Sequence, residues 1–93
     1  MSERMMWAAW RVWAAAVRDR QPPHTNISPV TAWWGGMLAR LLDTWQQQQQ
    51  RAGRVDGASN LAHPLEVAIE TAIKRILAAG VQPPAELSRI ASR

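Results

Sequence analysis

Apolar residues at helical spacing dominate the N-terminal part of the chain and constrain its fold more than any other feature. Met6, Trp10, Trp13 and Val17 fall on one narrow face when the sequence is placed at ~100° per residue, the angle of an α-helix. The proline pair of "QPPH" then interrupts the pattern, because proline breaks a helix. This stretch predicts an amphipathic helix over residues 3–20 with its narrow apolar face in the core.

A second apolar pattern follows the motif "SPVTAWW" and predicts a helix over residues 29–50. Ser28 is a favoured N-cap residue. Pro29 suits the first helical position, where the missing N–H would have no helical partner in any case. The expected core face combines large aliphatic and aromatic side chains. Its members are Val30, Trp34, Met37, Leu38, Leu41 and Trp45.

Gly35 and Gly36 fall within this second helix, where each glycine costs up to ~1 kcal/mol relative to alanine. With Ala32 and Ala39 they form a small-residue patch that would allow another helix to approach closely. The alternative is a kink or a break at the glycine pair. We expect a continuous helix.

The C-terminal part of the chain predicts a flexible connection and two further helices. Gly, Asp, Ser and Asn accumulate over residues 51–60, as is typical of loops. Apolar periodicity predicts a helix over 64–79 that ends at Gly80 as a left-handed C-cap, and then a short helix over 84–91. No strand pattern appears anywhere. The expected fold is therefore all-α, a compact bundle of three main helices plus a short C-terminal helix in one domain over residues 1–93.

Composition limits the classes of function. The 93-residue chain has no cysteine, which excludes disulfides, thiolate metal sites and cysteine nucleophiles. Its net charge of +4 permits nucleic acid, an anionic membrane or an acidic protein as the partner. No apolar stretch is long enough to span a bilayer, and Arg11 interrupts the N-terminal apolar run that could resemble an export signal. We therefore expect a cytoplasmic protein.

The sequence contains no pattern typical of catalysis, metal binding or cofactor binding, and we expect no catalytic residue, metal or cofactor. His24 and His63 each adjoin a proline in an expected loop, and no cluster of His, Asp and Glu has the spacing of metal ligands. Glu66 and Glu70 can share one helix face, but two exposed carboxylates without an apolar pocket usually form a solvated surface. The protein is thus expected not to be an enzyme.

Arg4, Trp7, Arg11 and Arg18 form the first candidate partner-binding surface. The arginines recur every seven residues in a stripe away from the core face, and Trp7 lies between that stripe and the core. Arginines beside an aromatic side chain can follow a phosphate backbone or form a hot spot in a protein interface. The competing interpretation is that Trp7 completes the core while the arginine stems cover its rim.

Trp33, together with the small-residue patch, forms the second candidate surface. A helix that is apolar on one side and lined by small residues on the other is often buried between neighbours. One such neighbour could belong to a second copy, which would give a homodimer through the first two helices. The alternative is packing within a single chain.

Small size, the absence of catalytic groups and a surplus of tryptophan are typical of an interaction protein. We expect a non-enzymatic helical protein that binds a partner protein, as an accessory or inhibitory factor of the kind found in phages or mobile elements. The alternative is a small basic protein that binds nucleic acid through Arg4, Arg11 and Arg18. A role at a membrane surface is the least favoured interpretation.

Overall fold

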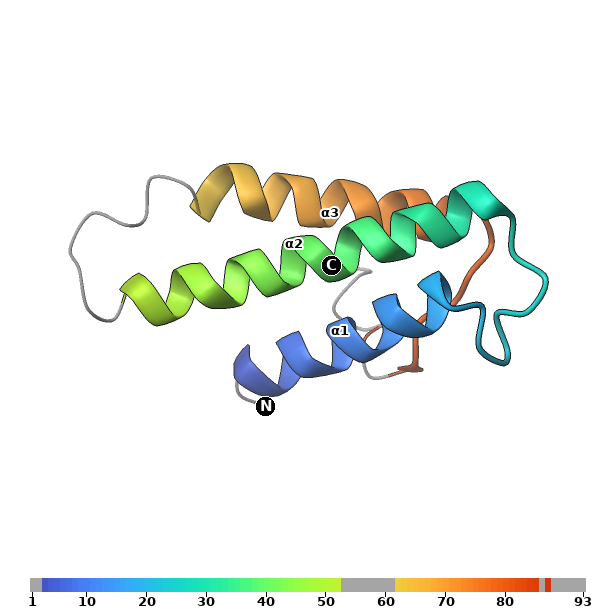
Figure 1. The fold of residues 1–93 in the computed structure, drawn as a ribbon, viewed down its shortest axis with the longest axis horizontal. Coiled ribbons are helices and arrows are strands. Elements are labelled where there is room, and N and C mark those ends of the chain that lie inside the picture. The colour runs from blue at the N-terminus through green and yellow to red at the C-terminus, as the bar shows by residue number, and fades with distance from the viewer. Residues whose placement is uncertain (1–2, 53–61, 86, 88–93) are drawn as a thin grey trace.

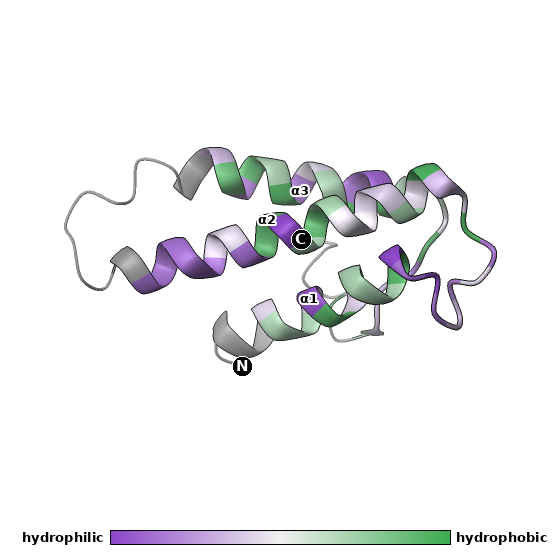
Figure 2. Ribbon diagram, viewed as in Figure 1, coloured by the Kyte–Doolittle hydropathy of each residue, from purple (hydrophilic) through white to green (hydrophobic). Residues whose placement is uncertain are grey.

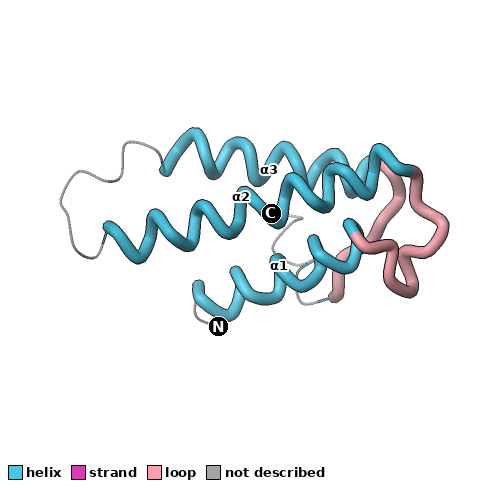
Figure 3. The backbone as a smooth tube through the Cα atoms, in the orientation of Figure 1, coloured by secondary structure: helices cyan, strands magenta, loops and turns pink. Residues whose placement is uncertain are grey.

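The computed structural model is all-helical in the part of the chain that it describes. This part comprises the backbone of residues 3–52, 62–85 and 87, with side chains described from residue 7 to 50, from 64 to 85 and at 87. Its helices are α1 (Glu3–Arg18), α2 (Pro29–Ala52) and α3 (Ala62–Ala78) (Figure 1). A loop joins α1 to α2, and no strand occurs among the described residues (Figure 3). The predicted all-α fold with three main helices is confirmed.

Helix α1 ends at Arg18 rather than at residue 20 because the chain adopts a left-handed turn there. Arg20 has a φ of 53°. Its N–H donates to the carbonyl of Val17 at 3.1 Å, and the N–H of Gln21 donates to the carbonyl of Ala16 at 2.9 Å. This pair of bonds is the Schellman motif, which satisfies the last carbonyls of a helix.

The second helix begins where the sequence predicts and extends further than predicted. Ser28 Oγ accepts a hydrogen bond from the N–H of Thr31 at 3.1 Å, which confirms Ser28 as the N-cap. Helix α2 then runs to Ala52 instead of residue 50, since glutamine, arginine and alanine all favour a helix. This C-terminal part of α2 is strongly hydrophilic (Figure 2).

Helix α3 begins before the predicted position, at Ala62 rather than residue 64, and ends at Ala78 rather than 79. Proline is tolerated in the first turn because the N–H groups there have no helical acceptor. Gly80 follows with a φ of 89°, as a left-handed C-cap should. The predicted connection over 51–60 is helical at its first two positions, and the rest of it lies outside the described residues. Most of the predicted helix over 84–91 also lies outside them.

Helix α2 is the central element of the fold. Both α1 and α3 pack along α2, and their backbones make no close contact with each other (Figure 1). The molecule is elongated, with extents of 44 × 26 × 21 Å. A helix flanked in this way has to present an apolar or small-residue surface on two sides, as the sequence of α2 does.

The glycine pair provides the surface on which α1 packs. Helix α2 is continuous through Gly35 and Gly36. A Cβ atom on Gly35 would lie 2.7 Å from the backbone nitrogen of Arg18 and 2.9 Å from Cγ1 of Val17. Only a residue without a side chain permits this approach. The small-residue patch is therefore used for packing within the chain.

The core joins all three helices and the segment that follows α3. Trp10 and Trp13 contact each other edge to face, with ring centroids 5.4 Å apart, and both are buried as predicted. Val30 is not a core residue, because its side chain is 66% exposed at the start of α2. The buried apolar residues are Trp10, Trp13, Ala14, Val17, Leu38, Ala39, Leu42, Ala72, Ile76, Val81 and Leu87.

Replacing each of the two glycines of α2 with alanine should change the stability of the protein in opposite directions. We expect Gly35→Ala to destabilise the protein by about 1–3 kcal/mol, because the new methyl group forces α1 away from α2. Gly36→Ala is the matched control. Its Cβ would lie 3.5 Å from Cγ of Arg18, an ordinary contact, so the variant should gain about 0.4–1 kcal/mol from the reduced entropy of the unfolded chain. Urea denaturation measures both, and the same sign of change in the two variants would contradict this account of helix packing.

Candidate functional site

Trp7 lies at the rim of the core and is attached to α2. Its indole N–H donates a hydrogen bond to the backbone carbonyl of Leu42. The ring is partly buried and packs against the core cluster. Trp7 therefore packs at the edge of the contact between α1 and α2.

Two arginines of α1, Arg11 and Arg18, have carboxylate partners. Arg11 Nε donates to Oδ1 of Asp43 on α2 at 2.9 Å. Arg18 donates through Nε and Nη2 to the two carboxylate oxygens of its neighbour Asp19, at 2.9 and 3.0 Å. The side chain of Arg4 lies outside the described residues. The structure thus places Arg11 in a bridge between helices and does not assemble the arginines into one unpaired stripe.

Asp19 is electrostatically coupled to Arg18. Hydrogen bonds from the Arg18 guanidinium hold the pKa of Asp19 below its ordinary value, and the charges of Arg18 and Arg11 act in the same direction. The same contact raises the pKa of Arg18. Both side chains are well exposed, so water screens the pair and it contributes little to stability.

Trp33 is exposed, with 56% of its surface accessible. It contacts Trp34 edge to face, with ring centroids 5.0 Å apart. The guanidinium of Arg75 on α3 lies over the other ring, 5.7 Å from the centroid of Trp34. Trp33 is thus separated from the glycine pair, which α1 covers, and only part of the second candidate surface is accessible.

A cleft of about 300 Å³ opens between α1 and α3. Its aromatic walls are Trp7 and Trp10 from α1 and Trp45 from α2. Leu42 and Ile69 add aliphatic surface between them. The cleft lies where the backbones of α1 and α3 remain apart on α2, and we call it the aromatic cleft.

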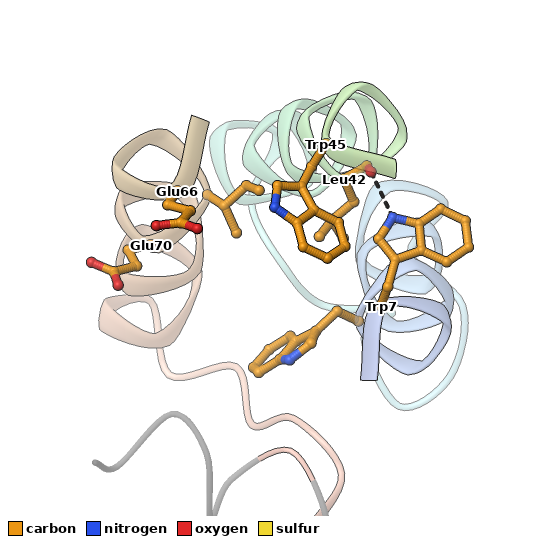
Figure 4. A pocket seen from close by; sticks show the side chains of 7 residues that line it. Trp7, Leu42, Trp45, Glu66 and Glu70 are labelled. Carbon is orange, nitrogen blue, oxygen red and sulfur yellow. Dashed lines mark hydrogen bonds between the residues drawn. The ribbon is translucent and has the colours of Figure 1, made fainter. Parts of the chain in front are cut away.

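Glu66 and Glu70 border the aromatic cleft on the α3 side. Figure 4 shows both side chains on α3, with Glu66 on the side nearer Trp45 and with the carboxylate of Glu70 directed away from the tryptophans. Both glutamates are exposed, as the sequence predicts. The sequence did not predict the apolar cleft that adjoins these exposed carboxylates.

A second cavity, of about 430 Å³, lies at the opposite end of α2. It is enclosed by the loop before α2 and by the turn after α3, and its lining includes His24, Thr31 and Gly80. It is larger than the aromatic cleft but contains no aromatic or charged wall apart from the histidine ring. The aromatic cleft is the better candidate site because large apolar walls meet charged groups there.

Within the described ranges, no group of three or more His, Cys, Asp or Glu residues could hold a metal ion. None of the described helices has both the length and the apolar character needed to cross a membrane. Comparisons of the chain with protein-family models, curated protein sequences and solved structures found no match. The function of the chain is therefore inferred from its own residues.

The sequence contained a partial signal for the aromatic cleft. Trp45 and Ile69 belong to core faces that periodicity identifies, yet both remain partly exposed. The spacing of Glu66 and Glu70 identifies a shared face on α3. Periodicity alone does not reveal which residues of α1 lie opposite that face.

The depressed pKa of Asp19 should depend on Arg18. We expect Arg18→Gln to raise the pKa of Asp19 toward its ordinary value, because the hydrogen bonds to the carboxylate are lost. A lowered folded-state pKa stabilises the protein above the pKa of the unfolded chain, and this effect disappears as the pH falls through the folded-state value. The Arg18→Gln variant should therefore lose stability only at a pH where Asp19 is ionised. NMR titration of the Asp19 carboxyl measures the shift.

Arg11→Gln is the control, since Arg11 acts on Asp19 only as a distant charge and should shift its pKa less. An equal pKa of Asp19 in the wild type and in Arg18→Gln would contradict the assignment.

Trp7→Phe should test the structural role of the indole. The substitution removes the donor to the Leu42 carbonyl, and we expect a loss of about 0.5–1.5 kcal/mol for the hydrogen bond. Trp33→Phe makes the same chemical change at an exposed site and should stay within about 0.5 kcal/mol of the wild type. Urea denaturation compares them, and equal stabilities would show that the hydrogen bond is unimportant.

Proposed function

We propose that this protein is a non-enzymatic interaction protein that binds a partner protein through the aromatic cleft. The observation that carries the proposal is the cleft itself, an apolar recess walled by Trp7, Trp10 and Trp45. Interface hot spots cluster in well-packed pockets of this kind, and tryptophan is enriched among the residues that dominate binding energy. An accessory or inhibitory role, of the phage or mobile-element type, and a cytoplasmic location belong to the same proposal.

The two tryptophans that α1 contributes to the cleft are held in place before any partner binds. Trp10 is 7% exposed and belongs to the core, and the indole of Trp7 is fixed by its bond to the Leu42 carbonyl. A binding surface whose side chains are already ordered loses little conformational entropy on association. This rigidity supports a role in binding.

Nucleic-acid binding is the alternative function and has less support. Arg11 and Arg18 would have to leave Asp43 and Asp19 in order to contact phosphates. Each carboxylate would then lie near the nucleic-acid backbone and repel it. The pairing of these arginines favours a protein partner.

Self-association is the other alternative, and the exposed residues Val30 and Trp33 would carry it. Their accessible fractions are 66% and 56%, and they lie one turn apart at the start of α2. Single exposed apolar residues are common on monomeric proteins. The cleft offers the larger set of converging apolar walls and is therefore preferred.

Capture of partners from a lysate of the organism that encodes the chain tests the proposal, with and without nuclease. We expect a stoichiometric protein partner that survives nuclease and whose capture falls about tenfold or more in Trp45→Ala, as for a hot-spot residue. Trp33→Ala makes the same substitution outside the cleft and should bind as the wild type does. Circular dichroism confirms that both variants are folded.

Each other outcome would contradict the proposal. Loss of binding in Trp33→Ala alone would show that the interface lies at the start of α2 and not at the cleft. Loss of the captured material with nuclease would favour the nucleic-acid alternative. Capture unaffected by Trp45→Ala would remove the cleft from the interface.

A further inference from the structure

The charge at the aromatic cleft differs in sign from that of the whole molecule. The chain has a net charge of +4, yet the charged residues that line the cleft are both acidic, Glu66 and Glu70. Neither carboxylate forms an ion pair with a described residue. Two unpaired negative charges thus lie at the edge of an apolar recess in a basic protein.

The aromatic walls favour the same kind of ligand as the carboxylates do. The face of an indole ring is electron-rich and attracts cations, and tryptophan is the strongest of the aromatic side chains in this respect. This chain already contains one such contact, because the guanidinium of Arg75 lies 5.7 Å from the centroid of Trp34. The tryptophans of the cleft have no comparable cation from the described residues.

The size of the cleft limits what can enter it. Its volume of about 300 Å³ is at the lower end of the range of about 300–1,000 Å³ for small-molecule pockets. A recess this small suits a single long side chain better than a helix or an extended strand. An apolar stem would contact the indoles, and a positive group at its end would reach the carboxylates.

We propose that the aromatic cleft binds an arginine side chain of the partner protein, with its guanidinium held between the indole faces and the carboxylates of Glu66 and Glu70. This inference rests on the proposed function and specifies the chemistry of the partner at the same site. Charge complementarity identifies the occupant, since the cleft combines apolar walls with unpaired negative charge at one side.

Arginine fits this cleft better than lysine does. The guanidinium is planar, so it stacks on an aromatic ring and donates parallel hydrogen bonds to a carboxylate. It is also more weakly hydrated than an ammonium group and is more readily transferred to a partly apolar site. Lysine would bind as a point charge, without stacking.

Titration with short peptides tests the inference. The ligand is acetyl-Leu-Arg-Leu-amide, and its matched control carries citrulline, a neutral isostere, in place of arginine. The indole N–H signals in NMR spectra report on the site. We expect saturable shifts at Trp7, Trp10 and Trp45 and none at Trp33. The citrulline peptide should bind about tenfold or more weakly, because it lacks the charge.

Variants of α3 test the role of the carboxylates. The double variant Glu66→Gln/Glu70→Gln should weaken binding of the arginine peptide about tenfold or more and leave the citrulline peptide unaffected. Both glutamates are exposed, so the variants should remain folded. The control Asp19→Asn removes a carboxylate outside the cleft and should change the affinity less than about twofold.

The results separate this inference from the proposed function. Equal affinities for the two peptides, or no shifts at the cleft tryptophans, would overturn the arginine assignment. Partner capture that still depended on Trp45 would then leave the protein-binding function intact. Conversely, the arginine peptide could bind as expected while Trp45→Ala leaves partner capture unchanged. This result would support arginine binding in the cleft and would show that the partner binds elsewhere.

Discussion

The close approach of α1 to α2 at Gly35 determines the rest of the structure. With no side chain at this position, the backbone of α2 lies directly against Val17 and the end of α1. The two helices run antiparallel from this point (Figure 1). One consequence is that Arg11 faces Asp43, and another is that Trp7 reaches the carbonyl of Leu42. A single contact between backbones thus sets the register of α1 along most of its length.

The aromatic cleft follows from the same arrangement. The backbones of α1 and α3 stay apart on α2, and Val81 and Leu87, which follow α3, join the core that these helices share. Toward the start of α1 the space is lined by large rings that do not fill it. Helices joined by short side chains would close such a gap, whereas bulky indoles keep the flanking helices apart. The tryptophan side chains therefore form part of the core and also line the open cleft.

Much of the fold could be predicted from local patterns, whereas the candidate site could not. The buried face with Trp10, Trp13 and Val17, the N-cap at Ser28 and the C-cap at Gly80 all depend on residues close together in the sequence. The bridge from Arg11 to Asp43 joins helices whose register no local pattern encodes. The position of Glu66 beside the tryptophans likewise depends on how three helices meet. The exposed Val30 shows a further limit, since periodicity identifies a face but not where its burial ends.

The separation of the α1 and α3 backbones means that a ligand in the cleft could affect the stability of the fold. The two outer helices have no close backbone contact with each other in the described part of the chain, although their side chains belong to one core. A ligand bound between Trp10 and Glu66 would contact α1 and α3 at the same time and would link the two helices at the cleft. Since a species that binds only the folded state raises its stability by RT ln(1 + [L]/Kd), such a ligand would stabilise the fold increasingly as its concentration rises above the dissociation constant. The free energy of ligand binding would then add to the free energy of unfolding.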